Sequence, residues 1–185
     1  LDLSGVRAPD ARLVDCEVTG CVLDDAHLDG LRLVDVTFTD TRASVIAATG
    51  SAWRDSAWRG GRLGALDASE SSLTRVDIAD CKIDMLNLGG TELRDVTLTR
   101  VQVGELFLGE ATGTGVRLVD CTIGVLDLHN ARIDGLDLSS SAVTDEFRGL
   151  TGLRGVVLSR QQAVDLAPDL ARHLGATVEN SSERD

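Results

Sequence analysis

The sequence has few aromatic residues: phenylalanine, tyrosine and tryptophan make up 3% of its 185 residues, and tyrosine is absent. A compact globule of this length usually holds more of them, so the composition favours a narrow core of leucine, isoleucine, valine and alanine. The sequence also lacks an apolar run long enough to span a membrane, and no secretory signal is visible. The chain length indicates one domain.

What the sequence has instead is a repeat of five residues. An apolar residue recurs at every fifth position, and a small or apolar residue precedes it by two. The apolar centres include Leu13, Val18, Leu23, Leu28, Leu33 and Phe38, and later Leu73, Ile78, Ile83, Leu88, Leu93 and Leu98. Two positions that are two apart point to one side of a strand, and the polar residues that follow each pair suit a turn. The repeat therefore predicts a β-solenoid.

Several of these fives resemble the consensus of the pentapeptide-repeat proteins, which is a small residue, Asp or Asn, Leu or Phe, and two polar residues. The matching fives are Val76–Asp80, Leu86–Gly90, Leu126–Asn130 and Leu136–Ser140. The resemblance implies an all-β solenoid, a right-handed quadrilateral β-helix with four fives, or twenty residues, in each of about eight coils. We expect this β-helix over residues 1–158.

The period changes after residue 158. Ser159 and Gln162 form a capping-box pattern at the start of a short helix, and Pro168 is expected to end that helix and begin a second one. Gly175 is expected to stop the second helix. We expect a helical C-terminal cap over 159–178, because a solenoid must cover its last coil. The polar residues 179–185 are expected to be a disordered tail.

The five-residue repeat is irregular in one coil and at one later position. The centres of the irregular coil are Ala43, Ala48, Trp53 and Trp58. In a four-sided coil each tryptophan would face an alanine, which keeps the core volume nearly constant. The alternative is that both tryptophans point outward as an anchor for a partner. Gly113 leaves a gap in the centre series, where we expect a loosened coil or a small void.

The four cysteines could form disulfides, but their positions in the five-residue repeat argue against it. Cys16, Cys21, Cys81 and Cys121 all occupy the small inward position. The last three share one column of stacked coils and lie two or more coils apart, roughly 10 Å or more, which is beyond disulfide reach. We therefore expect buried free thiols, which fit a cytoplasmic location.

Residues with catalytic or metal-binding patterns are missing from the sequence. The histidines are far apart, no Cys/His metal spacing occurs, and no nucleophile motif is present. A solid rod offers no cleft in which the pKa values of two carboxylates could be moved apart. We predict no enzymatic activity, no metal and no cofactor.

The formal net charge is −12, and residues 1–158, with 15 Lys and Arg against 25 Asp and Glu, carry −10 of it. Such a rod favours basic protein partners over nucleic acid or membranes. Residues twenty apart stack, and the predicted acidic columns are Asp15, Asp35, Asp55 and Asp95 at one corner and Asp40, Asp80 and Asp120 at a neighbouring one. A basic column comprises Arg42, Arg62 and Lys82. The acidic columns suit either a solvated surface or an imitation of a phosphate backbone.

The family resemblance also bears on function. Some pentapeptide-repeat proteins without inserted loops are quinolone-resistance proteins that bind DNA gyrase or topoisomerase IV in place of DNA, as dimers joined through their C-terminal caps. The resemblance implies a DNA mimic that binds a type II topoisomerase, as a homodimer, with fluoroquinolone resistance as its expected effect. The alternative is a structural or protein-interaction scaffold with an unidentified target.

Two surfaces are candidates for the dimer contact. Met85, Phe107 and Val125 stand at outward positions and are expected to form a lateral apolar patch. The competing site is the apolar face of the cap, with Leu166, Leu170 and Leu174. A third possibility is that the cap folds back over the lateral patch within one chain.

Overall fold

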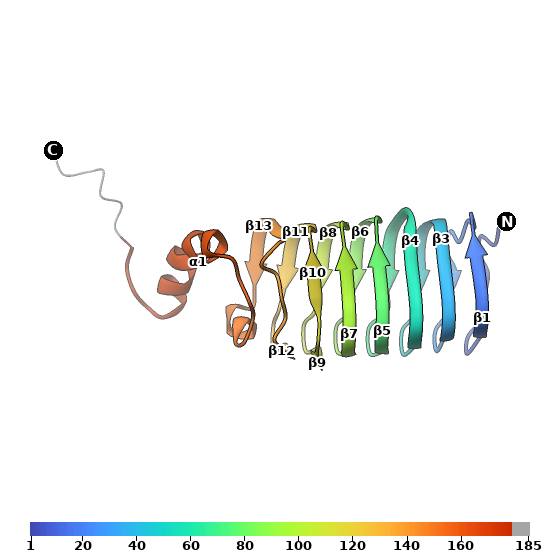
Figure 1. Ribbon diagram of the computed structural model, residues 1–185, viewed down its shortest axis with the longest axis horizontal. Helices are drawn as coiled ribbons and strands as arrows, with labels where there is room; N and C mark the ends of the chain where they lie inside the picture. The colour runs from blue at the N-terminus through green and yellow to red at the C-terminus, as the bar shows by residue number, and fades with distance from the viewer. Residues whose placement is uncertain (179–185) are drawn as a thin grey trace.

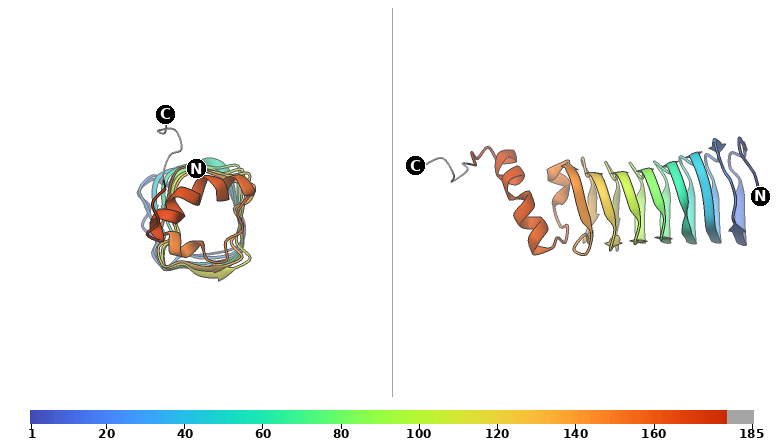
Figure 2. Two further views of the ribbon diagram at one scale, coloured as in Figure 1. Left: turned by 90° about the vertical axis from the view of Figure 1, so that its left-hand side faces the viewer. Right: turned by 90° about the horizontal axis from the view of Figure 1, so that it is seen from above.

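The computed structural model describes residues 1–178 as a straight rod of stacked coils followed by a helix (Figure 1). Viewed along its axis the rod is square (Figure 2). The expected quadrilateral β-helix with a helical cap is thus confirmed. The tail predicted over residues 179–185 lies outside the described residues.

Residues 1–178 contain one sheet of 13 strands. The strands are β1 Arg12–Thr19, β2 Ala26–His27, β3 Arg32–Ala47, β4 Ala52–Asp67, β5 Ser72–Ala79, β6 Lys82–Asn87, β7 Glu92–Thr99, β8 Gln102–Phe107, β9 Thr112–Thr114, β10 Arg117–Val119, β11 Thr122–Asp127, β12 Arg132–Asp134 and β13 Ala142–Arg148. A 3-10 turn at Leu150–Leu153 and helix α1 at Arg160–His173 follow them.

Almost every strand pairs in parallel with the strand twenty residues further along the chain. Trp53 of β4, for example, pairs with Leu33 below it and with Leu73 above it. The same register extends from the bridge Asp2↔Val22 to the bridge Asp137↔Val157, except that β11 and β13 pair at twenty-one residues from Val125↔Glu146 onward. Four fives per coil, the number implied by the family resemblance, is therefore the number in the structure.

Most corners of the coil have a left-handed backbone, which explains their composition. Asp15, Asp35 and Asp55, for example, stack at one corner with φ of 51°, 56° and 51°. Glycine, asparagine and aspartate tolerate this conformation better than other residues. The corner of Met85 differs, because strands β3, β4, β6, β8 and β11 run through it with negative φ. Longer and β-branched side chains such as Val125 are therefore allowed there.

Both tryptophans point into the core. Trp53 and Trp58 are 3% and 4% exposed, and the Trp58 ring stacks on Phe38 with a centroid distance of 4.3 Å. Ala43 and Ala48 are buried on the other walls of the coil. The prediction of volume compensation is confirmed, and the alternative of an outward anchor is wrong.

The expectation of a loosened coil at Gly113 is also wrong. Strand β9 pairs in register with β7 below and β12 above, so the ladder is continuous through Gly113. A Cβ atom at this position would collide with the carbonyl oxygen of Leu93. Glycine is needed here because the backbone of one coil closely approaches that of the next.

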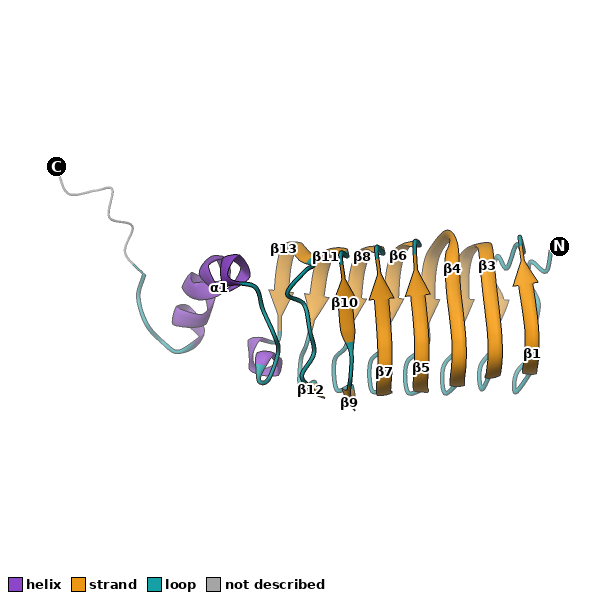
Figure 3. Cartoon of the chain, in the orientation of Figure 1, coloured by secondary structure: helices purple, strands orange, loops and turns teal. Residues whose placement is uncertain are grey.

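The cap is one helix and not two (Figure 3). The predicted capping box is present, since the Ser159 side chain accepts from the Gln162 backbone and the Gln162 side chain accepts from the Ser159 backbone. The Gln162 Nε2 group also donates to the carbonyl oxygens of Leu138 and Ser141, at 3.0 and 2.8 Å, which fixes α1 to the last coil. This anchoring, with Leu166 buried, offsets the single backbone hydrogen bond that Pro168 removes.

The four cysteines are free, as expected, and three of them are buried. Burial raises the pKa of the Cys81 thiol to about 11. In residues 1–178, no helix has the length and the apolar composition that spanning a membrane requires.

Candidate protein-interaction surfaces

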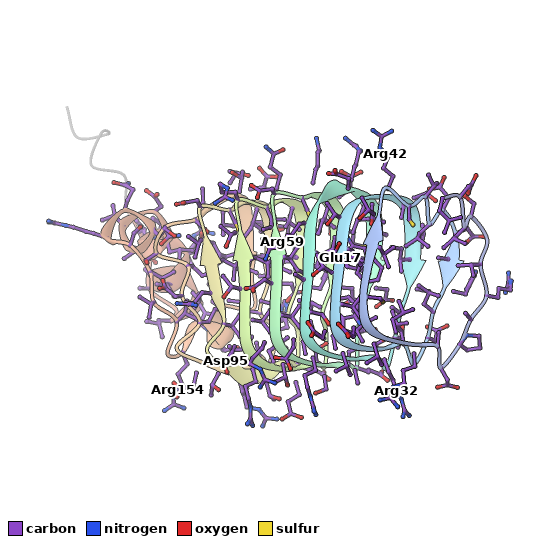
Figure 4. All side chains as sticks on the ribbon, turned by 45° about the vertical axis from the view of Figure 1, so that its right-hand side comes forward. Glu17, Arg32, Arg42, Arg59, Asp95 and Arg154 are labelled. Carbon is purple, nitrogen blue, oxygen red and sulfur yellow. The ribbon has the colours of Figure 1, made fainter. Side chains whose placement is uncertain are left out.

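The predicted acidic columns lie on one side of the rod, which we call the ladder side and define as residues 15–20, 35–40, 55–60, 75–80, 95–100, 115–120 and 135–140. Its two corners carry Asp15, Asp35, Asp55 and Asp95 and, across the strand, Asp40, Asp80 and Asp120, all with φ between 51° and 57°. All seven residues are exposed. In Figure 4, Glu17 and Arg59 lie on this side and Asp95 lies at its edge.

Arginines interrupt both acidic columns. Arg75 stands above Asp55 and donates through Nε and Nη2 to both carboxylate oxygens, with an Nη2 distance of 2.8 Å. Arg100 binds Asp80 in the same two-pronged way, at 2.7 and 2.8 Å. These hydrogen bonds lower the pKa values of Asp55 and Asp80. The ladder side therefore alternates in charge near its middle and is not a continuous negative stripe.

The opposite side of the rod carries acidic residues with no lysine or arginine among them. We call it the carboxylate-rich side and define it as residues 25–30, 45–50, 65–70, 85–90, 105–110 and 125–130. Its acidic residues are Asp25, Asp29, Asp67, Glu70, Glu105, Glu110 and Asp127. A basic partner is attracted to this side without having to displace a competing arginine.

Between these two sides lies an arginine face that the sequence analysis missed. Its six exposed members are Arg12, Arg32, Arg54, Arg94, Arg132 and Arg154. None of them forms an ion pair within residues 1–178. Figure 4 shows Arg32 and Arg154 projecting from the same edge of the rod, near its two ends. Of the predicted basic column on another face, Arg62 is paired with Asp84 at 3.4 Å.

The predicted lateral patch is a hollow rather than an exposed stripe. Met85 and Phe107 are half-buried and line a hollow of about 480 Å³, which we call the Met85 hollow. Its other lining residues are Asn87, Gly89, Gly109, Glu110, Asp127 and His129. Val125 is half-buried and is not among the lining residues. The structure thus brings two of the three predicted residues together.

The three predicted cap residues have different environments. Leu166 is 4% exposed because it packs on the end of the coil, so it is unavailable to a second chain. Leu170 is half-buried, whereas Leu174 is 82% exposed. Val164, which the sequence analysis did not select, is 60% exposed on the same helix. An apolar surface therefore remains open on α1.

The described residues contain no group of three or more His, Cys, Asp or Glu side chains placed to hold a metal ion. The arrangement of side chains is one of charged and apolar surfaces along a rigid rod. Such surfaces bind other macromolecules through charge complementarity and apolar anchors.

No protein-family model matches the sequence, and no curated protein matches it significantly. Solved structures of similar fold include full-length QnrB1, a plasmid-mediated fluoroquinolone resistance protein, at 15% identity over 91% of this chain and 96% of that chain, with a TM-score of 0.31. Another is HetL, a pentapeptide repeat protein involved in heterocyst differentiation regulation from the cyanobacterium Nostoc, at 15% identity over 84% and 86%, with a TM-score of 0.23.

The five-residue repeat and the four-sided coil of this chain are those of the pentapeptide-repeat fold. With the exception of Gly113, the sides from residue 21 to residue 138 each contribute an apolar centre to the core, and the coils up to Ile123↔Val143 each take twenty residues. The identities and TM-scores above are too low for the comparison to bear on a partner. The function of this chain has to be argued from its own surfaces.

Proposed function

We propose that the chain is a non-enzymatic interaction protein whose acidic rod binds a basic protein surface in place of DNA, with DNA gyrase or topoisomerase IV as the candidate partner. The observation that carries the proposal is the stacking of exposed aspartates in two columns along the ladder side of the rod. Stacked coils lie roughly 4.8 Å apart, and duplex DNA carries one charge per about 3.4 Å along each strand.

The rigidity of the rod supports the same proposal. The backbone of each inner coil is hydrogen-bonded to the coils on both sides, and the twenty-residue register is unbroken from the bridge at Asp2 to the pair Ile123↔Val143. A rigid array of charges loses little conformational entropy on binding, as does a duplex. A basic groove shaped for DNA could therefore accept the rod.

A second candidate function is that of a protein-interaction scaffold whose target is another protein. The pairs Arg75–Asp55 and Arg100–Asp80 favour it, because they neutralise two carboxylates in the columns that would have to imitate phosphates. The arginine face favours it as well, since a basic groove that enclosed the whole rod would meet these arginines. In both candidate functions the protein binds a macromolecule and carries out no reaction.

Inhibition of gyrase supercoiling by the purified protein is the direct test. The first prediction is that the wild-type chain inhibits at micromolar concentration and that Asp15→Asn, Asp35→Asn and Asp55→Asn together weaken inhibition several-fold. Asparagine tolerates the left-handed corners, so the coil is kept while three charges are removed.

The matched control removes three exposed charges from outside the ladder side, through Asp10→Asn, Glu92→Gln and Asp134→Asn. If the two triple variants lose inhibition equally, net charge is responsible and the ladder side is not a specific contact. If the wild-type chain does not inhibit at all, the proposal of mimicry is wrong for this enzyme and the scaffold candidate remains.

The homodimer is part of the proposal, with α1 as the contact. Leu174 and Val164 leave apolar area open on a helix whose inner face, at Leu166, is already covered. A second copy of the same helix would cover that area through a two-fold contact. The lateral patch is the weaker candidate for the contact, because Met85 and Phe107 are partly buried within their own chain.

A further inference from the structure

The Met85 hollow exists because neighbouring coils have unlike side chains in register. Phe107 pairs with Asn87 below and Asp127 above, so a large ring stands in a column of small polar groups. Beside that column stand Gly89 and Gly109, which have no side chains to fill the space. The thioether of Met85 and the ring of Phe107 thus form an apolar lining for an open hollow.

The rim of the hollow is acidic and includes a residue that the backbone does not favour. Glu110 has φ of 60°, in the left-handed region that suits glycine, asparagine and aspartate. Within residues 1–178 the Glu110 carboxylate makes no ion pair. On the other edge, Asp127 Oδ1 lies 2.9 Å from the His129 backbone nitrogen, which donates to it, and 2.7 Å from the His129 Nδ1 atom. The Glu110 carboxylate, unlike that of Asp127, therefore takes part in neither a turn hydrogen bond nor an ion pair within residues 1–178.

An aromatic ring beside carboxylates favours one kind of side chain. A guanidinium group stacks on an aromatic face and pairs with carboxylates at its edge, while its aliphatic stem covers apolar surface. A phosphate or a nucleic acid would be repelled by the carboxylates. A purely aliphatic side chain would use the ring and the thioether but would leave the Glu110 carboxylate without a counter-charge.

We propose that the Met85 hollow holds an arginine side chain of a basic partner protein. The hollow would be the anchor pocket of the carboxylate-rich side, and the absence of lysine and arginine from that side favours the approach of a cation. The inference rests on the proposed function only in taking the partner to be a basic protein. It places one contact of that partner on the side of the rod opposite the ladder side.

The experiment uses the only methionine in the chain as a reporter. Protein labelled with carbon-13 at the methionine methyl group gives one signal from position 85, identified by its loss in Met85→Leu. We expect a saturable shift of this signal on titration with the tripeptide acetyl-Gly-Arg-Gly-amide. The same peptide with citrulline, which has the shape of arginine without its charge, should bind at least about threefold more weakly, as should the peptide with leucine.

Two variants locate the binding. Phe107→Asn copies the residue one coil below, so the coil should fold, and it should abolish the arginine-dependent shift. Glu110→Gln should weaken binding at least about threefold, whereas Asp84→Asn, on a corner outside the hollow, should leave it unchanged. The proposal is overturned if arginine causes no shift, or if citrulline or leucine shifts the signal equally. Because no topoisomerase is present, this result is independent of the supercoiling assay.

Discussion

Replacing Trp58 with alanine tests the packing of the irregular coil. Trp58 is 4% exposed, stacks on Phe38 and lies 6.1 Å from the Trp53 ring between centroids. The coil walls cannot move inward to fill the space, because each wall is hydrogen-bonded to the coils above and below it. The variant should therefore keep most of its cavity.

The expected magnitude follows from opposing effects. Truncating a buried tryptophan to alanine costs roughly 3–5 kcal/mol of unfolding free energy, and loss of the ring stack places the value high in that range. The Trp58 Nε1 group is buried without a hydrogen-bond partner, however. Removing this unsatisfied group should raise the unfolding free energy by roughly 1 kcal/mol or more, which partly offsets the loss. We expect a net loss of about 3–4 kcal/mol.

Urea denaturation followed by far-ultraviolet circular dichroism measures the loss, provided that the slopes of the unfolding transitions agree. The control Asp84→Ala removes only an exposed pair with Arg62 and should cost less than about 1 kcal/mol. In a Trp58→Leu background, Ala48→Leu should recover part of the loss, since it refills the same coil. A loss near that of Asp84→Ala, or a further loss on adding Ala48→Leu, would refute the packing argument.

Two further predictions concern the thiols and the dimer. With a thiol reagent at mildly alkaline pH, half-buried Cys16 should react in the folded chain and the three buried cysteines only after denaturation. Because burial raises the pKa of Cys81 from 9.0 to about 11, folding stability from this neutral thiol is complete below pH 9.0 and falls as pH rises towards 11. If the chain is a dimer by light scattering, Leu174→Asp should give monomers. Met85→Lys combined with Phe107→Asp should not, and the reverse result would assign the lateral contact.

The sequence was sufficient for the five-residue period and for the direction of most side chains, whereas the number of fives per coil came from the family resemblance. The spacing of Leu73, Ile78 and Ile83 implies inward side chains at every fifth residue, and all three are buried. The inward position of Trp58 followed from the alanines in the same coil. These predictions hold because core volume and strand alternation depend only on residue size and order.

Features that depend on backbone geometry or on two columns at once could not be predicted. Nothing in the sequence shows that the corner at Met85 is extended, so its apolar residues suggested an exposed stripe. At Gly113 the missing side chain suggested a void, whereas the close approach of Leu93 demands glycine. The arginine face escaped notice because its members are divided between two neighbouring columns, as Arg32 and Arg54 are, and only Arg12 and Arg32 stack directly on one another.

The left-handed backbone at the corners also affects which charged residues point to a partner. Aspartate is favoured at a left-handed corner whatever the protein binds, so a column of corner aspartates is weak evidence for mimicry. Arg75, Arg100, Glu70 and Glu110 stand at such corners against that preference. The arginines have a structural reason, since each binds the aspartate one coil below. The two glutamates make no ion pair within residues 1–178 and lie on the carboxylate-rich side. A partner that requires negative charge there would explain them, and it would bind opposite the longest column of aspartates.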